Sequence, residues 1–322
     1  MINKAVRTAL LKRRPDTNKG DYGHVFVIAG SVGMTGAAYL AAQAALLSGS
    51  GLVTAGIPRS LNIILSRKTV EVMTRPLPET KQQTLSLKAF PEIERFIKLR
   101  RPDVLAVGPG LSQNKETQAL IRKVISKIDL PMVIDADGLN AFVKPCHSER
   151  AQRAKNLTLD SSAAFGSLRM TYDKIITPHP GEMARLLGIS VREVQKDRKN
   201  VAKKVAADYN VITVLKGHRT IVADPGGRVY INKTGNPGMA SAGCGDVLTG
   251  MIASFMGQGI KPFEAARLGV YLHGRAGDLA AKQVGQVSLK ATDLLKYIPS
   301  VIKSLATSRP FTPRRCKYTY AV

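Results

Sequence analysis

The 322-residue sequence contains little cysteine and no long apolar run. Its cysteines, Cys146, Cys244 and Cys316, are too few and too far apart for a disulfide framework or a zinc site, which indicates a reducing compartment. No stretch approaches the roughly 20 uninterrupted apolar residues of a membrane span, and the N-terminus has no apolar signal core. We therefore expect a cytoplasmic protein without a membrane partner.

Acidic residues are also scarce, because 23 Asp and Glu stand against 48 Lys and Arg, and the formal net charge is +25. A nucleic-acid-binding protein would be basic as well. However, the sequence has no zinc finger, no RNA-binding aromatic signature and no dense basic helix, so the charge lacks a recognition element. Polyanionic small substrates or a general lysine and arginine bias explain it equally. We expect no nucleic-acid partner.

Short apolar runs alternate with helical segments along the chain. Strands are predicted at residues 24–30, 52–57, 103–110, 132–137, 174–178, 211–215, 220–223 and 229–232. The last two strands should form a hairpin over a turn at 224–227. Helices are predicted at 35–48, 115–127, 181–187, 191–209, 246–256, 262–283 and 291–305. This alternation predicts an α/β fold whose mostly parallel sheet is covered on both faces.

The segments outside this pattern are basic or irregular. Residues 1–18 are expected to form a basic N-terminal arm, and residues 308–322 a disordered basic tail. Residues 143–172 follow no clear period and are interpreted as an irregular insertion within one domain that spans 19–307.

The most informative motif is Gly243-Cys244-Gly245-Asp246, directly ahead of an apolar helical run. Glycines lack a Cβ, so backbone N–H groups can approach an anion, and the helix adds unpaired amides and the positive end of its dipole. A carboxylate placed against a phosphate can take a proton from a hydroxyl nucleophile as phosphoryl transfer begins. A second interpretation stays open, because aspartate is also a favoured helix N-cap.

Glycines follow two other predicted strands. Gly30-Ser-Val-Gly-Met-Thr-Gly36 fits a loose dinucleotide-binding pattern. The next strand region, 52–58, contains no acidic residue to bind a ribose, so a redox dehydrogenase is not favoured. Gly108-Pro-Gly110 at another strand end would let the backbone approach a ligand closely.

Acidic residues at strand and helix ends have two interpretations each. In Asp135-Ala-Asp137-Gly-Leu-Asn140, the carboxylates could orient magnesium or accept hydrogen bonds from turn amides. The structural role is favoured for Asp135, whereas Asp137 and Asn140 stay open. Glu182 is expected to cap the helix that follows Gly181.

Several blocks together resemble one known family. They are Lys19-Gly-Asp-Tyr-Gly-His-Val-Phe-Val-Ile-Ala-Gly-Ser31, Gly36-Ala-Ala-Tyr-Leu-Ala-Ala42, Thr177-Pro-His-Pro-Gly-Glu-Met-Ala-Arg-Leu-Leu-Gly188 and the Gly-Cys-Gly-Asp motif. In content and order they resemble the ADP- or ATP-dependent NAD(P)H-hydrate dehydratases of the ribokinase-like superfamily, over about Lys19 to Pro299. Such agreement is more specific than a single glycine motif. It implies a ribokinase-like three-layer α/β/α sandwich with a central, mostly parallel sheet.

That family repairs nicotinamide cofactor in which water has added to the ring and left a hydroxyl on C6. The resemblance implies dehydration of the S epimer of hydrated NADH or NADPH, through phosphorylation of that hydroxyl and elimination of phosphate. ADP or ATP would be the donor and Mg²⁺ the metal, with no ligands assigned to it. A homo-oligomer is implied, with a tetramer favoured. Because the chain before Lys19 is too short for the epimerase domain sometimes fused there, we expect a stand-alone dehydratase served by a separate epimerase.

The resemblance also assigns site residues. Asp246 would be the catalytic base and would contact substrate together with Ala37, Gly110 and His179. The expected nucleotide-binding residues are Lys216, Gly217, His218, Arg219, Thr220, Asn236, Gly243, Cys244 and Gly245. Amides of the last three would neutralise the transferring phosphoryl group. The family usually has Ser, Thr or Gly in place of Cys244, so we expect activity to survive there, with an oxidisable thiol as the open concern.

Each of these assignments has a structural alternative. Lys216 could be a solvated lysine at a strand end, His179 a structural histidine held by its flanking prolines, and Asn236 a residue that only orders its turn. Two other functions also stay open. One is a small-molecule kinase of the same superfamily that acts on a hydroxymethylpyrimidine, a thiazole alcohol or a sugar. The other is a non-enzymatic nucleotide sensor or nucleic-acid binder, suggested by charge alone.

Overall fold

The computed structural model describes residues 10–11, 13–143 and 173–307. The tail expected at 308–322, nearly all of the insertion expected at 143–172 and more than half of the arm lie outside the described residues. Strands form one nine-stranded sheet in the order β3-β2-β1-β4-β5-β6-β7-β8-β9. Their bounds are β1 (His24–Ile28), β2 (Leu52–Pro58), β3 (Met73–Leu77), β4 (Val104–Val107), β5 (Met132–Ile134), β6 (Lys174–Ile176), β7 (Ile212–Leu215), β8 (Ile221–Ala223) and β9 (Val229–Ile231).

The sheet is mostly parallel, as predicted. All neighbours from β3 to β7 pair in parallel, whereas β8 pairs antiparallel with both β7 and β9. The hairpin predicted over the turn at 224–227 is therefore confirmed. Strand order reverses at β1, since β2 and β3 lie on one side of it and β4 to β7 on the other. In open sheets of this kind, ligands bind beyond the carboxyl ends of the strands at such a switch point.

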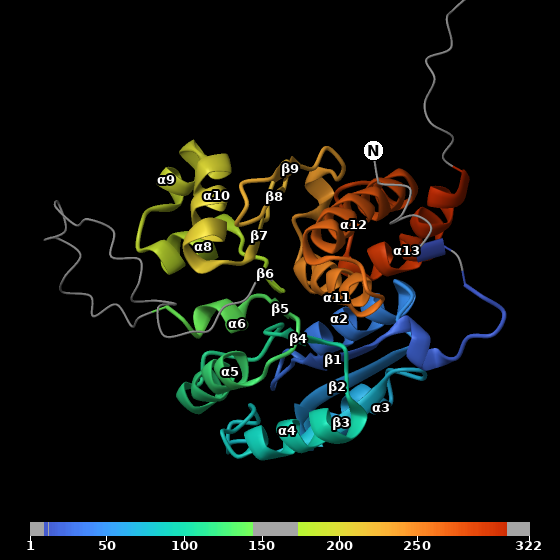
Figure 1. Cartoon of the computed structure of the whole chain (residues 1–322), viewed down its shortest axis with the longest axis vertical. Coiled ribbons are helices and arrows are strands. Elements are labelled where there is room, and N and C mark those ends of the chain that lie inside the picture. The colour runs from blue at the N-terminus through green and yellow to red at the C-terminus, as the bar shows by residue number, and fades with distance from the viewer. Residues whose placement is uncertain (1–9, 12, 144–172, 308–322) are drawn as a thin grey trace, which may run out of the picture.

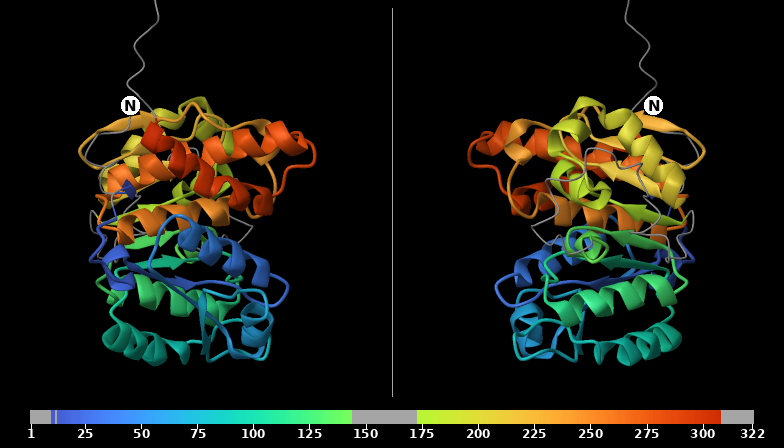
Figure 2. Two further views of the ribbon diagram at one scale, coloured as in Figure 1. Left: turned by 90° about the vertical axis from the view of Figure 1, so that its right-hand side faces the viewer. Right: turned by 90° about the vertical axis from the view of Figure 1, so that its left-hand side faces the viewer.

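Helices cover both faces of the sheet, as Figures 1 and 2 show. One layer contains α2 (Thr35–Leu47), α3 (Asn62–Ser66), α11 (Cys244–Gly257), α12 (Pro262–Val284) and α13 (Ala291–Thr307). The other contains α4 (Ala89–Arg100), α5 (Lys115–Lys127), α6 (Asp137–Asn140), α8 (Pro180–Leu187), α9 (Val191–Lys196) and α10 (Arg198–Tyr209). Short 3₁₀ turns are η1 (Lys19–Tyr22), η2 (Arg59–Leu61) and η3 (Pro237–Met239).

Successive strand residues point to opposite helix layers. In β1, Val25 and Val27 belong to the core beneath α11, whereas Phe26 and Ile28 belong to the core beneath α4 and α5. All four are buried, which explains why β1 is apolar throughout instead of alternating with polar residues. Among the described residues, none of the helices combines the length and hydropathy that crossing a membrane requires.

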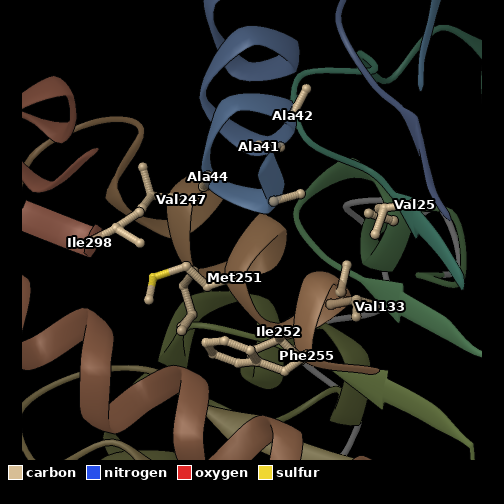
Figure 3. Packing of buried hydrophobic residues seen from close by; sticks show 14 of the residues in the cluster. Val25, Ala41, Ala42, Ala44, Val133, Val247, Met251, Ile252, Phe255 and Ile298 are labelled. Carbon is tan, nitrogen blue, oxygen red and sulfur yellow. The ribbon is translucent and has the colours of Figure 1, made fainter. Parts of the chain in front are cut away.

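The contact between α2 and α11 helps to position the Gly243–Asp246 turn at the start of α11. Figure 3 shows Val247 and Met251 of α11 near the alanines of α2, whereas Phe255 lies farther along α11, near Val133. A Cβ at Gly250 would lie 2.0 Å from the carbonyl oxygen of Ala41, so the two helices approach more closely than any larger residue permits. Alanine on one helix and glycine on the other therefore let α2 and α11 pack closely against each other.

Several expectations about the elements were wrong. The strand β3 and the helices α3, α4 and α6 were not predicted, although buried Phe90 and Ile93 in α4 have helical spacing. The helix predicted at 191–209 is two helices, because Asp197 has φ −146° and caps α10 by accepting the N–H of Asn200. The helix predicted at 246–256 begins earlier, at Cys244.

Candidate active site

The glycine motif forms the first turn of α11. Gly243 is the N-cap residue with φ +88°, and a Cβ there would lie 2.4 Å from Cδ1 of Leu40. Glycine is thus required by both conformation and space. Asp246 is the third residue of the helix, and no side chain caps this end, so the interpretation of Asp246 as N-cap is wrong. The N–H of Cys244 donates to the carbonyl oxygen of Ser241 at 3.4 Å, whereas within the described residues the N–H groups of Gly245 and Asp246 have no protein acceptor, which suits anion binding.

Asp246 is half-buried among other charged groups. Burial first, and then the negative charge of Asp135, raise its pKa from 3.8 to about 7, and the carboxylates of Asp137 and Glu182 act in the same direction. The ammonium of Lys216 opposes this shift. A general base is most effective when its pKa lies near the working pH, and Asp246 meets that condition.

Lys216 directly follows β7 and lies beside the glycine turn that begins α11. Its Nζ is 2.6 Å from Oδ1 of Asp135 and 3.7 Å from Oε2 of Glu182. Burial lowers the pKa of Lys216, but these two carboxylates outweigh burial, so the pKa is raised and the amine stays charged. A Cβ on Gly245 would lie 3.4 Å from the same Nζ. With 18 % of its side chain exposed, Lys216 is not the solvated lysine of the alternative interpretation.

Asp135 and Asp137 accept hydrogen bonds. Asp135 is buried, and its second oxygen accepts from Oγ1 of Thr249 at 2.8 Å. Asp135 therefore has the favoured structural role, although its partners are side chains and not turn amides. Asp137 accepts from the N–H of Ser112 at 2.8 Å and from Nδ2 of Asn140 at 3.1 Å. Within the part of the chain that the structure describes, no group of three acidic, histidine or cysteine side chains is arranged for a metal.

His179 is the N-cap residue of α8. Its Nδ1 accepts the N–H groups of Gly181 at 3.0 Å and Glu182 at 3.2 Å, so the ring proton resides on Nε2. Burial lowers the pKa of His179 and keeps the ring neutral. Oε2 of Glu182 in turn accepts the N–H of His179 at 2.7 Å, which confirms the expected capping role of Glu182. His179 thus has a structural role in capping α8. Its side chain is half-exposed, its Nε2 lies 3.4 Å from Oε1 of Glu182, and contact with substrate stays a prediction.

The predicted substrate residues Ala37 and Gly110 lie together at the switch point. A Cβ on Gly110, which has φ +61°, would lie 2.9 Å from the Cβ of Ala37. The ends of β1 and β4 are joined there, because the N–H of Gly30 donates to the carbonyl of Pro109 at 2.9 Å. One helical turn beyond Ala37, Leu40 touches Gly243. The fold therefore brings Ala37, Gly110 and the start of α11 to one edge of the sheet.

Asn236 orders its own turn. Its side chain accepts the N–H of Gly238 at 3.0 Å and donates to Asp278 of α12 at 3.2 Å. The turn-ordering alternative thus describes what Asn236 does in this structure, and nucleotide contact by Asn236 stays a prediction. Nε2 of His273, also in α12, lies 2.8 Å from the carbonyl oxygen of Cys244, and this contact ties the first turn of α11 to α12.

Cys244 is buried and lies 3.3 Å from Oγ of Ser241. Burial raises the pKa of its thiol, which disfavours the reactive thiolate at neutral pH. No local sequence pattern predicts Thr249, Asp278 or His273, because each contacts a partner at least 29 residues away in the sequence.

These features define an α/β protein with a glycine turn, a helix N-terminus and a carboxylate at one sheet edge, an arrangement that suits phosphoryl transfer. A family model described as NAD(P)H-hydrate dehydratase matches residues 25–300. The chain belongs to this family.

The bifunctional NAD(P)H-hydrate repair enzyme of Moorella thermoacetica is 48 % identical over 300 residues, which cover 93 % of this chain and 53 % of that protein. The chain spans about half the length of such bifunctional relatives. The ADP-dependent (S)-NAD(P)H-hydrate dehydratase of Neisseria meningitidis serogroup B is 36 % identical over 280 residues, or 85 % of this chain and 82 % of that one.

Among solved structures, the ADP/ATP-dependent NAD(P)H-hydrate dehydratase of Bacillus subtilis, crystallised with ATP and Mg²⁺, matches with a TM-score of 0.72 and 30 % identity. The match covers 93 % of this chain and 96 % of that chain. The ribokinase-like sandwich implied by the sequence resemblance is thereby confirmed.

Proposed function

We propose that the protein is an ADP- or ATP-dependent dehydratase that converts the S epimer of hydrated NADH or NADPH to the reduced cofactor. The observation that carries this proposal is the position of Asp246. It lies in the first turn of α11, at a helix N-terminus whose amides suit a phosphate, and has a pKa of about 7. The family match and the names of the Neisseria and Bacillus relatives support the same activity.

In the proposed reaction, Asp246 takes the proton of the C6 hydroxyl while that oxygen attacks the terminal phosphorus of the nucleotide. The bond from that phosphorus to the bridging oxygen breaks, and the shortened nucleotide departs. The C6–O bond of the phosphate ester then breaks with its electron pair on phosphate, because the ring nitrogen supplies electrons to C6. Loss of the C5 proton restores the ring double bond. Amides of Gly243, Cys244 and Gly245 would stabilise the charge that develops during transfer.

Lys216 would complete the phosphate site next to the first turn of α11. Its ammonium lies next to Gly245 and stays charged because Asp135 and Glu182 hold it. Mg²⁺ bound to the nucleotide would offset phosphate charge. The oxygens of Asp135 and Asp137 already accept hydrogen bonds, so the residues present fit a metal carried on the phosphates better than one enclosed by protein ligands.

The proposal also includes the supply of the substrate, the location of the protein and its oligomeric state. A separate epimerase activity would supply the S epimer, because a base at one fixed position can serve only one stereochemistry at C6. A cytoplasmic location and a homo-oligomer, with a tetramer favoured, stay predictions.

The test is to incubate the pure protein with hydrated NADH, Mg²⁺ and either ADP or ATP while following the absorbance of reduced nicotinamide. We expect recovery that depends on nucleotide and is abolished in Asp246→Asn. Accumulation of a stable phosphate ester from a hydroxymethylpyrimidine, a thiazole alcohol or a sugar, without cofactor repair, would favour the kinase alternative. Salt-sensitive polynucleotide binding without turnover would favour the sensor alternative.

A further inference from the structure

Arg198, the first residue of α10, contacts the loop that follows β7. Its Nη2 donates to the carbonyl oxygens of Leu215 at 3.1 Å and Lys216 at 3.0 Å. Its Nη1 donates to the carbonyl oxygen of His218. Arginine suits this task, since its planar guanidinium presents several donors in a fixed fork, whereas an ammonium offers a single point of charge.

The loop needs such a donor because of how it turns. Gly217 has φ +132° and Arg219 has φ +54°, so the backbone reverses within a few residues. The reversal brings three carbonyl oxygens toward one point, where they would repel one another without a donor group between them. The fourth carbonyl of this stretch, that of Gly217, accepts from Oγ1 of Thr220 at 3.0 Å. All four carbonyl oxygens from Leu215 to His218 therefore have side-chain donors.

This arrangement also sets the direction of the amides. In a trans peptide the N–H points opposite to the preceding carbonyl. The carbonyls of Lys216 and His218 point to Arg198, so the N–H groups of Gly217 and Arg219 point away from α10. Within the described residues, these two N–H groups donate to no protein acceptor. They face outward from the loop and are available to a ligand or to water.

The charge of the guanidinium is not cancelled locally. Among the described ion pairs, none pairs Arg198 with a carboxylate, and its Nε is buried without an acceptor. The guanidinium therefore adds positive potential beneath the loop in addition to holding its shape. Outward amides above a positive charge form a backbone site for an anion or for a hydrogen-bond acceptor of a base or a ribose.

We propose that Arg198 is a positioning residue for the adenine nucleotide: it holds the carbonyls of the 215–218 turn inward so that the amides of Gly217 and Arg219 face the nucleotide. This inference rests on the proposed function, because it takes residues 216–220 to be the nucleotide loop. Arg198 acts through the loop and contacts no reacting atom. A merely structural role would instead lower stability and impair both substrates alike.

The test measures ADP and ATP binding directly, by calorimetry without hydrated cofactor, for the parent, Arg198→Ala, Arg198→Lys and Arg192→Ala. Arg192 is exposed on the neighbouring helix α9 and serves as the matched control for loss of one positive charge. In Arg198→Ala we expect the nucleotide Kd to rise about tenfold or more, while the KM for hydrated cofactor stays within about twofold. Arg198→Lys should be intermediate and Arg192→Ala unchanged.

Two further measurements separate positioning from folding. Guanidinium ion, added below the concentration that unfolds the protein, should partly restore nucleotide affinity to Arg198→Ala, whereas sodium at equal ionic strength should not. Gly217→Ala should weaken nucleotide binding without removing the charge, because its φ is +132° and its Cβ would lie 3.0 Å from Nη2 of Arg198. This variant tests the loop geometry even if Arg198→Ala folds poorly.

The outcomes distinguish this inference from the proposed function. Parental nucleotide affinity in folded Arg198→Ala, or equal losses for nucleotide and hydrated cofactor, would overturn the positioning role and leave the proposed function standing. Weakened nucleotide binding in Arg198→Ala, in a parent that fails to repair hydrated cofactor, would support the positioning role and reject the function. A parent that binds neither ADP nor ATP would overturn both.

Discussion

Replacing the proposed base should stabilise the protein while abolishing its activity. Asp246→Asn retains the shape of the side chain but cannot ionise. In the folded protein the pKa of Asp246 is raised to about 7 from 3.8, because burial and the charge of Asp135 oppose ionisation. Between those two pH values the unfolded chain releases a proton that the folded chain keeps, so the parent loses stability as pH rises. The asparagine variant does not carry this cost.

The magnitude follows from the shift. A difference of about three pKa units corresponds to at most about 4 kcal/mol. Since Asp246 is only half-buried, we expect a gain of about 2 kcal/mol in the free energy of unfolding at pH 8, or roughly 4 °C in Tm. Near pH 4 most of the advantage should vanish, because Asp246 is then protonated in the folded protein and about half protonated in the unfolded chain, whose pKa is 3.8.

Urea unfolding of parent and variant at pH 4, 6 and 8 measures this difference directly. Asp129→Asn, at an exposed site just after the end of α5, provides the control for loss of one negative charge and should show little change. Activity of Asp246→Asn should fall by at least about 100-fold, the range of a lost general base. A stability difference that stays constant with pH, or that turns against the variant at pH 8, would refute the reasoning.

The remaining predictions concern the groups around that base. In Gly245→Val, the Cβ would lie 3.4 Å from Nζ of Lys216, and the two γ-methyl groups would cover the backbone amides of the turn. The value of kcat/KM for nucleotide should therefore fall about 100-fold or more in steady-state assays, while Tm shifts only slightly. Asp135→Asn removes the carboxylate that lies 2.6 Å from the Lys216 ammonium, so the free energy of unfolding in urea titrations should fall by about 3 kcal/mol. An unchanged urea midpoint would contradict a stabilising role for this ion pair. Cys244→Ser should keep nearly parental kcat because the loop acts through its backbone. In a chain whose other cysteines are serine, iodoacetamide should label Cys244 slowly at pH 7, since burial raises the pKa of the thiol; rapid labelling would contradict that environment.

The sequence by itself determined the elements that carry a local signal. Apolar runs ending in glycine predicted β1 and β4, and the Asp224–Gly227 turn predicted the β8–β9 hairpin. The Gly-x-Gly-Asp motif predicted a helix start next to a carboxylate, because glycine conformation and helix-end chemistry are properties of a few adjacent residues. By contrast, β3 was missed, since a short edge strand with a proline lacks alternation.

Tertiary structure decided what the charged residues do. Lys216, Asp135 and Thr249 lie far apart in the sequence. Only the folded sheet brings Nζ of Lys216 to 2.6 Å from one oxygen of Asp135 and Oγ1 of Thr249 to 2.8 Å from the other. Likewise, no sequence pattern assigns Arg198 to the turn after β7. The pKa of Asp246 depends on burial and on the charges around it, and both arise only when α2 and α11 close against the sheet. Electrostatic interactions act through space, so their outcome belongs to the fold, whereas backbone conformation and capping belong largely to the local sequence.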